Sequence, residues 1–133
     1  MEIILAENHG FCYGVKRAVE MANEAANNDG KSYTLGPIIH NPQVVGRLED
    51  KGVSPVQEVS DIEEGTMIIR SHGVGPAIYE EAEEKGLNIV DATCPHVKKA
   101  QQDAKSVIED GMTLVILGEK NHPEVKSLSL IHI

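Results

Sequence analysis

Hydrophobic residues along the chain follow two alternating patterns. Short runs rich in β-branched residues are typical of buried strands. Longer stretches carry apolar residues at every third or fourth position, which is typical of a helix with one buried stripe. The clearest stripe consists of Val15, Ala18, Val19, Ala22 and Ala26. Because strands that alternate with helices build parallel βα units, the pattern predicts an α/β protein with a parallel sheet between helices.

The same pattern predicts the element boundaries. Strands are expected at residues 2–6, 32–35, 67–70, 88–91 and 113–117. Besides the helix after Cys12, helices are expected at residues 41–51 and 76–85, each followed by a glycine. The segment 53–65 contains Pro55 and several acidic residues, so we expect an irregular connection there.

The chain repeats itself at an offset of 82 residues, the spacing from Cys12 to Cys94. The two copies share a cysteine, a helix start, a strand end and a histidine. The aligned pairs are "CYGVKRA" at 12–18 with "CPHVKKA" at 94–100, Leu35-Gly36 with Leu117-Gly118, and His40 with His122. The repeat predicts one complete lobe at residues 1–93 and the start of a second lobe at 94–126.

Chemically capable side chains follow each predicted strand. In a parallel sheet, ligands bind beyond the carboxyl ends of the strands. In strand order, these side chains are Cys12, His40, Ser71 with His72, Thr93 with Cys94, and His122 with Glu124. A single cysteine or histidine in such a place is more often a buried or capping residue. Because five positions share one edge of the sheet, we interpret them as one site.

Two kinds of chemistry fit this set. A cysteine in the first turn of a helix lies in the positive end of the helix dipole, which suits a metal-binding thiolate. The long spacing between Cys12 and Cys94 is unlike a zinc knuckle, whereas iron-sulfur clusters accept distant ligands, although two thiolates are too few for a four-iron cluster. The histidines precede predicted helix N-termini, where free N–H groups attract phosphate. Glu124 could deliver protons or simply complement a helix dipole.

The charge of the chain narrows the range of partners. The net charge is -9, from 12 basic and 21 acidic residues, which disfavours nonspecific binding to nucleic acid or to an anionic membrane. No apolar run approaches the roughly 18 residues of a spanning helix, and no leader pattern is visible at the N-terminus. We therefore expect a cytoplasmic protein with free thiols and with small-molecule or protein partners.

Five motifs occur in order over residues 1 to about 126. They are "GFCYGVKRAV", "LGPIIHNPQVV", "RSHGV", "DATCPHVKK" and "HPEV". Together they closely resemble the LytB family of 4-hydroxy-3-methylbut-2-enyl diphosphate reductases, which act in the methylerythritol phosphate route to isoprenoids. The resemblance implies three α/β lobes around a central [4Fe-4S] cluster, with one cysteine from each lobe. Cys12 and Cys94 would be two ligands, the third lies outside this chain, and the glycines around Cys12 would let the backbone approach the cluster.

The resemblance also implies roles for the other candidate residues. His40, His72 and His122 would bind the diphosphate of the substrate, and Glu124 would supply protons to its allylic hydroxyl group. The products would be isopentenyl and dimethylallyl diphosphates. The electrons would come from a donor such as ferredoxin or flavodoxin.

One departure and two alternatives accompany this interpretation. The family usually has a glycine shortly after "HPEV", whereas this chain has Ser127, so residues 127–133 are expected to be an atypical and foreign tail. Because the family's third cysteine and third lobe are not in this sequence, the chain is expected to be an incomplete, inactive N-terminal fragment. One alternative is a structural module in which the cysteines and histidines bind zinc. Another is a nucleotide-binding domain, although "HGVGPA" matches neither G-x-G-x-x-G nor a P-loop.

Overall fold

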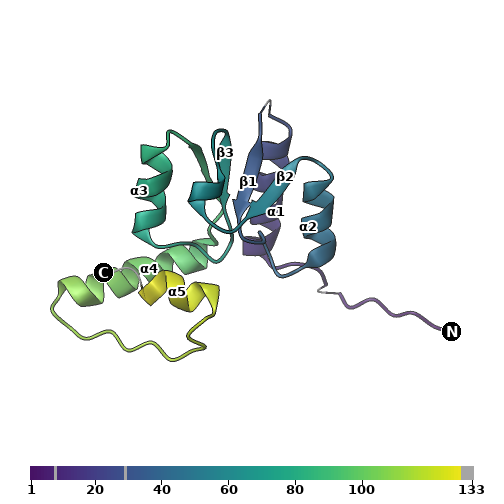
Figure 1. The fold of residues 1–133 in the computed structure, drawn as a ribbon. Helices are drawn as coiled ribbons and strands as arrows, with labels where there is room; N and C mark the ends of the chain where they lie inside the picture. Colours follow the sequence, from purple (N-terminus) through teal and green to yellow (C-terminus); the bar gives the residue numbers. More distant parts are fainter. Residues whose placement is uncertain (8, 29, 130–133) are drawn as a thin grey trace.

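The chain folds around one parallel sheet, and the predicted α/β class is confirmed (Figure 1). The computed structural model describes residues 1–7, 9–28 and 30–129. The strand order is β2-β1-β3-β4, and every neighbouring pair is parallel. The strands are β1 (Ser32–Leu35), β2 (Val53–Val56), β3 (Thr66–Ile69) and β4 (Asn88–Asp91). The helices are α1 (Tyr13–Ala26), α2 (Pro42–Glu49), the 3-10 turn η1 (Val59–Asp61), α3 (Pro76–Glu84), α4 (Pro95–Glu109) and α5 (Pro123–Ser129).

Helices cover both faces of the sheet. In Figure 1, α1 and α2 lie on one side of the strands and α3 lies on the other. Successive residues of a strand point to opposite faces, so Ile68 joins the core under α1 and α2, while Met67 and Ile69 join the core under α3. All three side chains are fully buried. Burial of each contributes about 1.5–3 kcal/mol, which makes β3 the central support of both layers.

Most predicted elements form where the sequence places them. The strands at 32–35 and 88–91 match the prediction, and β3 begins one residue earlier than expected. The helices α1, α2 and α3 are confirmed with slightly shorter ends. Helices α1 and α4 each begin one residue after a cysteine, so the 82-residue repeat holds for its helices.

Two predicted strands are wrong: residues 2–6 and 113–117 are not strands. Most of their apolar side chains are exposed, with Ile4 at 82% and Leu117 at 95%, and only Leu114 and Ile116 are half-buried. A strand persists only where a neighbouring strand accepts and donates its backbone hydrogen bonds. Within the described residues the two segments have no such neighbour, so their strand-like pattern does not lead to pairing.

The expectation of an irregular connection at 53–65 is wrong at its start, because residues 53–56 form β2. Pro55 suggested a break, since proline cannot donate a hydrogen bond to a sheet. Strand β2 lies at the edge of the sheet and pairs only with β1, where Pro55 is opposite Thr34. A proline is tolerated there because one side of an edge strand needs no partner.

Helices α4 and α5 pack together at one end of the sheet (Figure 1). The link from β4 to α4 is short and is held to β3: the Ala92 N–H donates to the Ile69 carbonyl at 3.0 Å. The carboxyl ends of the strands therefore face the N-terminus of α4. Among residues 1–7, 9–28 and 30–129, no helix is both long and apolar enough to cross a membrane.

Candidate active site

Three histidines from distant parts of the sequence meet at one place. His40 lies between β1 and α2, His72 follows β3, and His122 immediately precedes α5. The ring centroids are 4.5 Å apart for His40 and His72, 6.2 Å for His40 and His122, and 6.0 Å for His72 and His122. His40 is exposed, His122 is half-buried and His72 is buried. We call these three side chains the histidine cluster.

The turn that carries His72 is fixed from three directions. The Ser71 hydroxyl donates to the Ile38 carbonyl at 3.2 Å, which ties the turn to the segment before His40. The Cys94 N–H donates to the Ser71 carbonyl at 2.9 Å, and the Ser127 hydroxyl donates to the His72 carbonyl at 3.2 Å. The turn is therefore rigidly placed relative to β1, α4 and α5.

Ser127 is a site-building residue that the sequence did not single out. It lies in the segment expected to be a foreign tail, yet it is in α5, its side chain is buried, and it bonds to the turn of His72. Its hydroxyl also bonds to the Glu124 carbonyl at 2.8 Å. No pattern in the sequence distinguishes such a serine from an ordinary helical one.

The buried ring of His72 is neutral at pH 7. Burial, together with His40, Arg70 and His122, lowers the pKa of His72 to about 4. Its Nδ1 is buried and has no hydrogen-bond partner among the described residues. An unpaired buried nitrogen is costly, and an anion placed beside the ring would both supply a partner and favour protonation.

His122 and Glu124 are linked through the first turn of α5. The Glu124 N–H donates to Nδ1 of His122 at 3.3 Å, so this nitrogen carries no proton and the neutral ring has its N–H at Nε2. Glu124 is partly exposed. Its carboxyl group lies two residues from a member of the histidine cluster, where it can exchange protons with a bound ligand.

The two cysteines occupy equivalent positions at neighbouring helix starts. Both are free thiols, and Cys12 caps α1 as Cys94 caps α4. A Cβ added to Gly14 would overlap Sγ of Cys94, so this sulfur lies directly against the first turn of α1. Arg17 of α1 donates to the Thr93 carbonyl at 3.2 Å, which holds the two helix starts together. Gly14 thus makes room for the other cysteine, a role that the sequence did not indicate.

The donor set fits part of an iron-sulfur site. Two thiols at adjoining helix N-termini, with a glycine that clears space beside one sulfur, are suitable for two ligands of a cluster. Within the part of the chain that the structure describes, no three His, Cys, Asp or Glu side chains converge as metal ligands.

The structure brings the three histidines together and sets the two cysteine-bearing helix starts side by side, although not always for the predicted reason. His40, His72 and Cys94 follow β1, β3 and β4, as expected. Cys12, His122 and Glu124 do not follow strands, because the segments 2–6 and 113–117 are not strands. They are positioned instead by the packing of α1 and α5. Thr93 is buried and contributes its backbone to the cysteine-bearing helix start.

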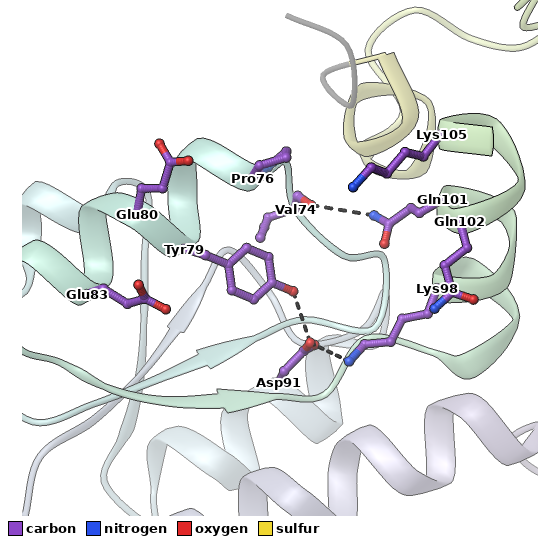
Figure 2. Close-up of a pocket in the computed structure, with 10 residues that line it drawn as sticks. All are labelled: Val74, Pro76, Tyr79, Glu80, Glu83, Asp91, Lys98, Gln101, Gln102 and Lys105. Atoms are coloured by element: carbon purple, nitrogen blue, oxygen red, sulfur yellow. Dashed lines mark hydrogen bonds and ion pairs between the residues drawn. The ribbon is translucent and has the colours of Figure 1, made fainter. Parts of the chain in front are cut away.

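A hollow of about 540 Å³ between α3, β4 and α4 contains none of the predicted site residues (Figure 2). Its floor is a network around Asp91, which accepts hydrogen bonds from Tyr79 Oη at 3.0 Å and from the Thr93 N–H at 2.9 Å. Lys98 Nζ lies 2.6 Å from the same carboxylate. Asp91 therefore joins α3, β4 and α4. Through its contacts with Thr93 and Lys98 it also stabilises the start of the helix that carries Cys94.

Replacing Asp91 with Asn should lower the free energy of unfolding by about 1–3 kcal/mol, mainly through lost hydrogen bonds to a charged acceptor. Burial raises the pKa of Asp91, but hydrogen bonds from Lys98, Thr93 and Tyr79 outweigh it and lower the pKa overall. Because the pKa of Asp91 is lower in the folded chain than in the unfolded chain, the ionised carboxylate stabilises the fold at pH values above its unfolded pKa. This stabilisation is lost as the pH falls through the pKa of the folded state. Urea denaturation at several pH values should show the difference between wild type and variant shrinking below about pH 4.

Tyr79→Phe tests the same hydrogen-bond network through the stability of the fold at alkaline pH. Burial and the Asp91 carboxylate raise the pKa of Tyr79 to about 12. Because the pKa of Tyr79 is higher in the folded chain, its contribution to stability is fully present below the unfolded pKa near 10. This contribution is lost as the pH rises through the folded pKa of about 12. The variant should lack this alkaline loss of stability. An unchanged urea midpoint for both variants at pH 7 would contradict a supporting role for Asp91.

A protein-family model described as "LytB protein" matches residues 3–131. The chain belongs to the LytB family. Curated members are 4-hydroxy-3-methylbut-2-enyl diphosphate reductases, for example those of Geotalea uraniireducens (strain Rf4) and Geobacter sulfurreducens (strain ATCC 51573 / DSM 12127 / PCA). Each is 55% identical to this chain over 128 residues, which are 96% of the chain and 45% of the relative. The LytB chain therefore spans a little under half the length of these relatives.

Solved structures agree with the family assignment. One is described as the structure of (E)-4-hydroxy-3-methyl-but-2-enyl diphosphate reductase, the terminal enzyme of the non-mevalonate pathway. It is 50% identical, has a TM-score of 0.85, and the match covers 97% of this LytB chain and 46% of the solved one. The other is the E-1-hydroxy-2-methyl-but-2-enyl-4-diphosphate reductase from Plasmodium falciparum. It is 31% identical, has a TM-score of 0.90, and the match covers 95% of this LytB chain and 40% of the solved one.

Proposed function

We propose that this LytB chain provides part of the active site of a 4-hydroxy-3-methylbut-2-enyl diphosphate reductase. The observation that carries the proposal is the histidine cluster: positions 40, 72 and 122 come from three separate segments, yet their rings lie within 4.5–6.2 Å of one another. Family membership and the names of the relatives support the reaction. The proposed protein is an oxidoreductase of isoprenoid synthesis by the methylerythritol phosphate pathway, located in the cytoplasm.

The histidine cluster binds the diphosphate of the substrate. Each neutral imidazole offers one N–H donor, and a proton taken up with the anion adds a charge-assisted hydrogen bond. His72 is suited to bind the anion because its buried Nδ1 lacks a hydrogen-bond partner among the residues described. The rigid turn around Ser71 holds this ring in place before the ligand arrives, so little ordering is needed on binding.

Glu124 supplies a proton to the allylic hydroxyl group, which then leaves as water. Its place in the first turn of α5, with its backbone N–H bonded to Nδ1 of His122, supports this role. The two products, isopentenyl and dimethylallyl diphosphate, differ only in where the second proton is added to the allylic carbon skeleton.

Cys12 and Cys94 would be two thiolate ligands of a [4Fe-4S] cluster. When bound, the cluster supplies the two electrons that reductive removal of the hydroxyl group requires. These electrons come from a donor such as ferredoxin or flavodoxin. The family's third cysteine and its further lobe belong to sequence that this chain does not include, and the proposed lobes here are residues 1–93 and 94–126. The experiments below therefore use a full-length protein, meaning this chain extended to the length of its relatives.

Replacing His40 or His72 with alanine in the full-length protein should weaken binding of inorganic pyrophosphate by about tenfold or more. Each variant loses one hydrogen bond to a charged group, which is worth about 1.5–3 kcal/mol. Isothermal titration calorimetry measures the affinity, and the Michaelis constant for the substrate should rise in parallel. The iron content should stay near that of the wild type.

His9→Ala is the matched control, because His9 is exposed in the segment before α1 and bonds locally to the Ala6 carbonyl at 2.8 Å. This variant should bind pyrophosphate as the wild type does. Wild-type affinity in both His40→Ala and His72→Ala would remove the histidine cluster from the diphosphate site and would overturn the proposal.

A further inference from the structure

Arg70 is a charged side chain without a partner beside the histidine cluster. It follows the last residue of β3 and immediately precedes Ser71 and His72. Its Nε is buried without a hydrogen-bond partner, and over residues 1–7, 9–28 and 30–129 no carboxylate forms an ion pair with it. In a chain with 21 acidic and 12 basic residues, an arginine left without an acidic partner is unexpected.

The fold makes room for this guanidinium group. Gly36, just after β1, has a φ of +72°, and a Cβ added there would lie 2.6 Å from Nη1 of Arg70. Any other residue at position 36 would be strained and would push the guanidinium away. The side chain of Arg70 therefore reaches from the end of β3 to the end of the neighbouring β1, at the edge of the sheet that carries the histidine cluster.

The charge of Arg70 acts on the cluster. Burial is the largest cause of the lowered pKa of His72, and the positive charge of Arg70 contributes with His40 and His122. Burial lowers the pKa of Arg70 itself, but an arginine remains charged at every physiological pH. Arg70 is thus a permanent cation that acts on His72, a hydrogen-bond donor of the cluster without a permanent charge.

We propose that Arg70 is a positioning residue that supplies the fixed positive charge of the diphosphate site and makes the histidine cluster select polyanionic ligands. This inference rests on the proposed function. Among the described residues the guanidinium has no acidic partner, so an incoming diphosphate provides its counter-charge. Its attraction grows with the charge of the ligand, so pyrophosphate gains more than inorganic phosphate.

Calorimetry on the full-length protein tests the inference. Arg70→Met should weaken pyrophosphate binding about tenfold or more and should weaken phosphate binding less. Arg70→Lys keeps the charge and should stay within about threefold of the wild type. Arg47→Met is the matched control, since Arg47 is exposed in the last turn of α2 and its removal changes the net charge equally.

A second readout separates a charge effect from a packing effect. In Arg70→Met the pKa of His72, measured by NMR titration of its ring, should rise, because one cation that opposes its protonation is gone; the other charges that face the ring are His40 and His122. In Arg70→Lys the pKa of His72 should stay low, because the lysine keeps the positive charge. A loss of structure alone would affect both variants alike and would appear in circular dichroism.

Unchanged pyrophosphate affinity in folded Arg70→Met, with His40→Ala weakened, overturns the inference and leaves the proposed function intact. Unchanged affinity in both removes the diphosphate site itself. Should Arg70→Met fail to fold, the wild type decides: its Arg70 Nε–H resonance must shift on titration with pyrophosphate and stay in place with sodium chloride of equal ionic strength. A resonance that does not move overturns the inference.

Discussion

Replacing Glu124 with Gln should lower the reductase turnover of the full-length protein by roughly a hundredfold or more, the scale of a lost acid catalyst. Glutamine keeps the size of the side chain and most of its hydrogen bonds, but it cannot release a proton. The backbone N–H that bonds to His122 is unaffected, so the histidine cluster should keep its arrangement. Substrate affinity should therefore change little while the maximal rate falls.

Glu119→Gln is the control for this experiment. Glu119 is exposed in the segment before α5 and meets His122 only through its backbone carbonyl, at 2.9 Å from the His122 nitrogen. Its variant should turn over at the wild-type rate. Near wild-type turnover in Glu124→Gln would show that Glu124 only complements the dipole of α5 and has no part in proton transfer.

Replacing Cys12 or Cys94 with Ser should abolish stable binding of iron and sulfide by the full-length protein. Each thiol is a proposed cluster ligand, and a serine hydroxyl is a poor substitute for a thiolate. The measurement is iron and acid-labile sulfide content after anaerobic reconstitution and desalting, together with the visible absorption of the cluster. Pyrophosphate binding should persist, because the histidine cluster does not depend on either sulfur.

A milder variant tests the geometry rather than the ligand. Gly14→Ala keeps both thiols but places a methyl group on Sγ of Cys94, so iron retention should fall well below the wild type. Gly46→Ala is the matched control, since it also lies in a helix and a Cβ there meets nothing within 4 Å. Full iron content in Gly14→Ala or in the serine variants would contradict the cysteine assignments.

The sequence predicts those strands well whose apolar runs find a partner strand in the fold. The runs at 32–35 and 88–91 are strands, since each has a partner strand within the described chain. The similar runs at 2–6 and 113–117 are not strands. An apolar run indicates that a segment can form a strand, but it does not show whether a neighbouring strand is there to pair with it. Strand β2 was missed because Pro55 breaks a central strand but not an edge strand.

The candidate site was predicted from residue type and position in the sequence. These reveal reactive side chains, but they do not reveal the residues that hold those side chains in place. The three histidines stand out in the sequence, and the structure brings them together. Arg70 does not stand out, because an arginine is ordinarily solvated and only the tertiary structure shows that it has no acidic partner among the described residues. Asp91 and Ser127 were missed for the same reason: their roles are hydrogen bonds to residues distant in sequence.

The central claim is that Cys12, Cys94 and the histidine cluster belong to one reductive diphosphate site. The most direct test is anaerobic reconstitution of the full-length protein with iron and sulfide, followed by desalting and incubation with 4-hydroxy-3-methylbut-2-enyl diphosphate and a chemical reductant. The predicted result is retained iron and sulfide together with isopentenyl and dimethylallyl diphosphates as products. A protein that binds zinc alone, retains no sulfide and forms neither product would contradict the claim and support a structural metal-binding module.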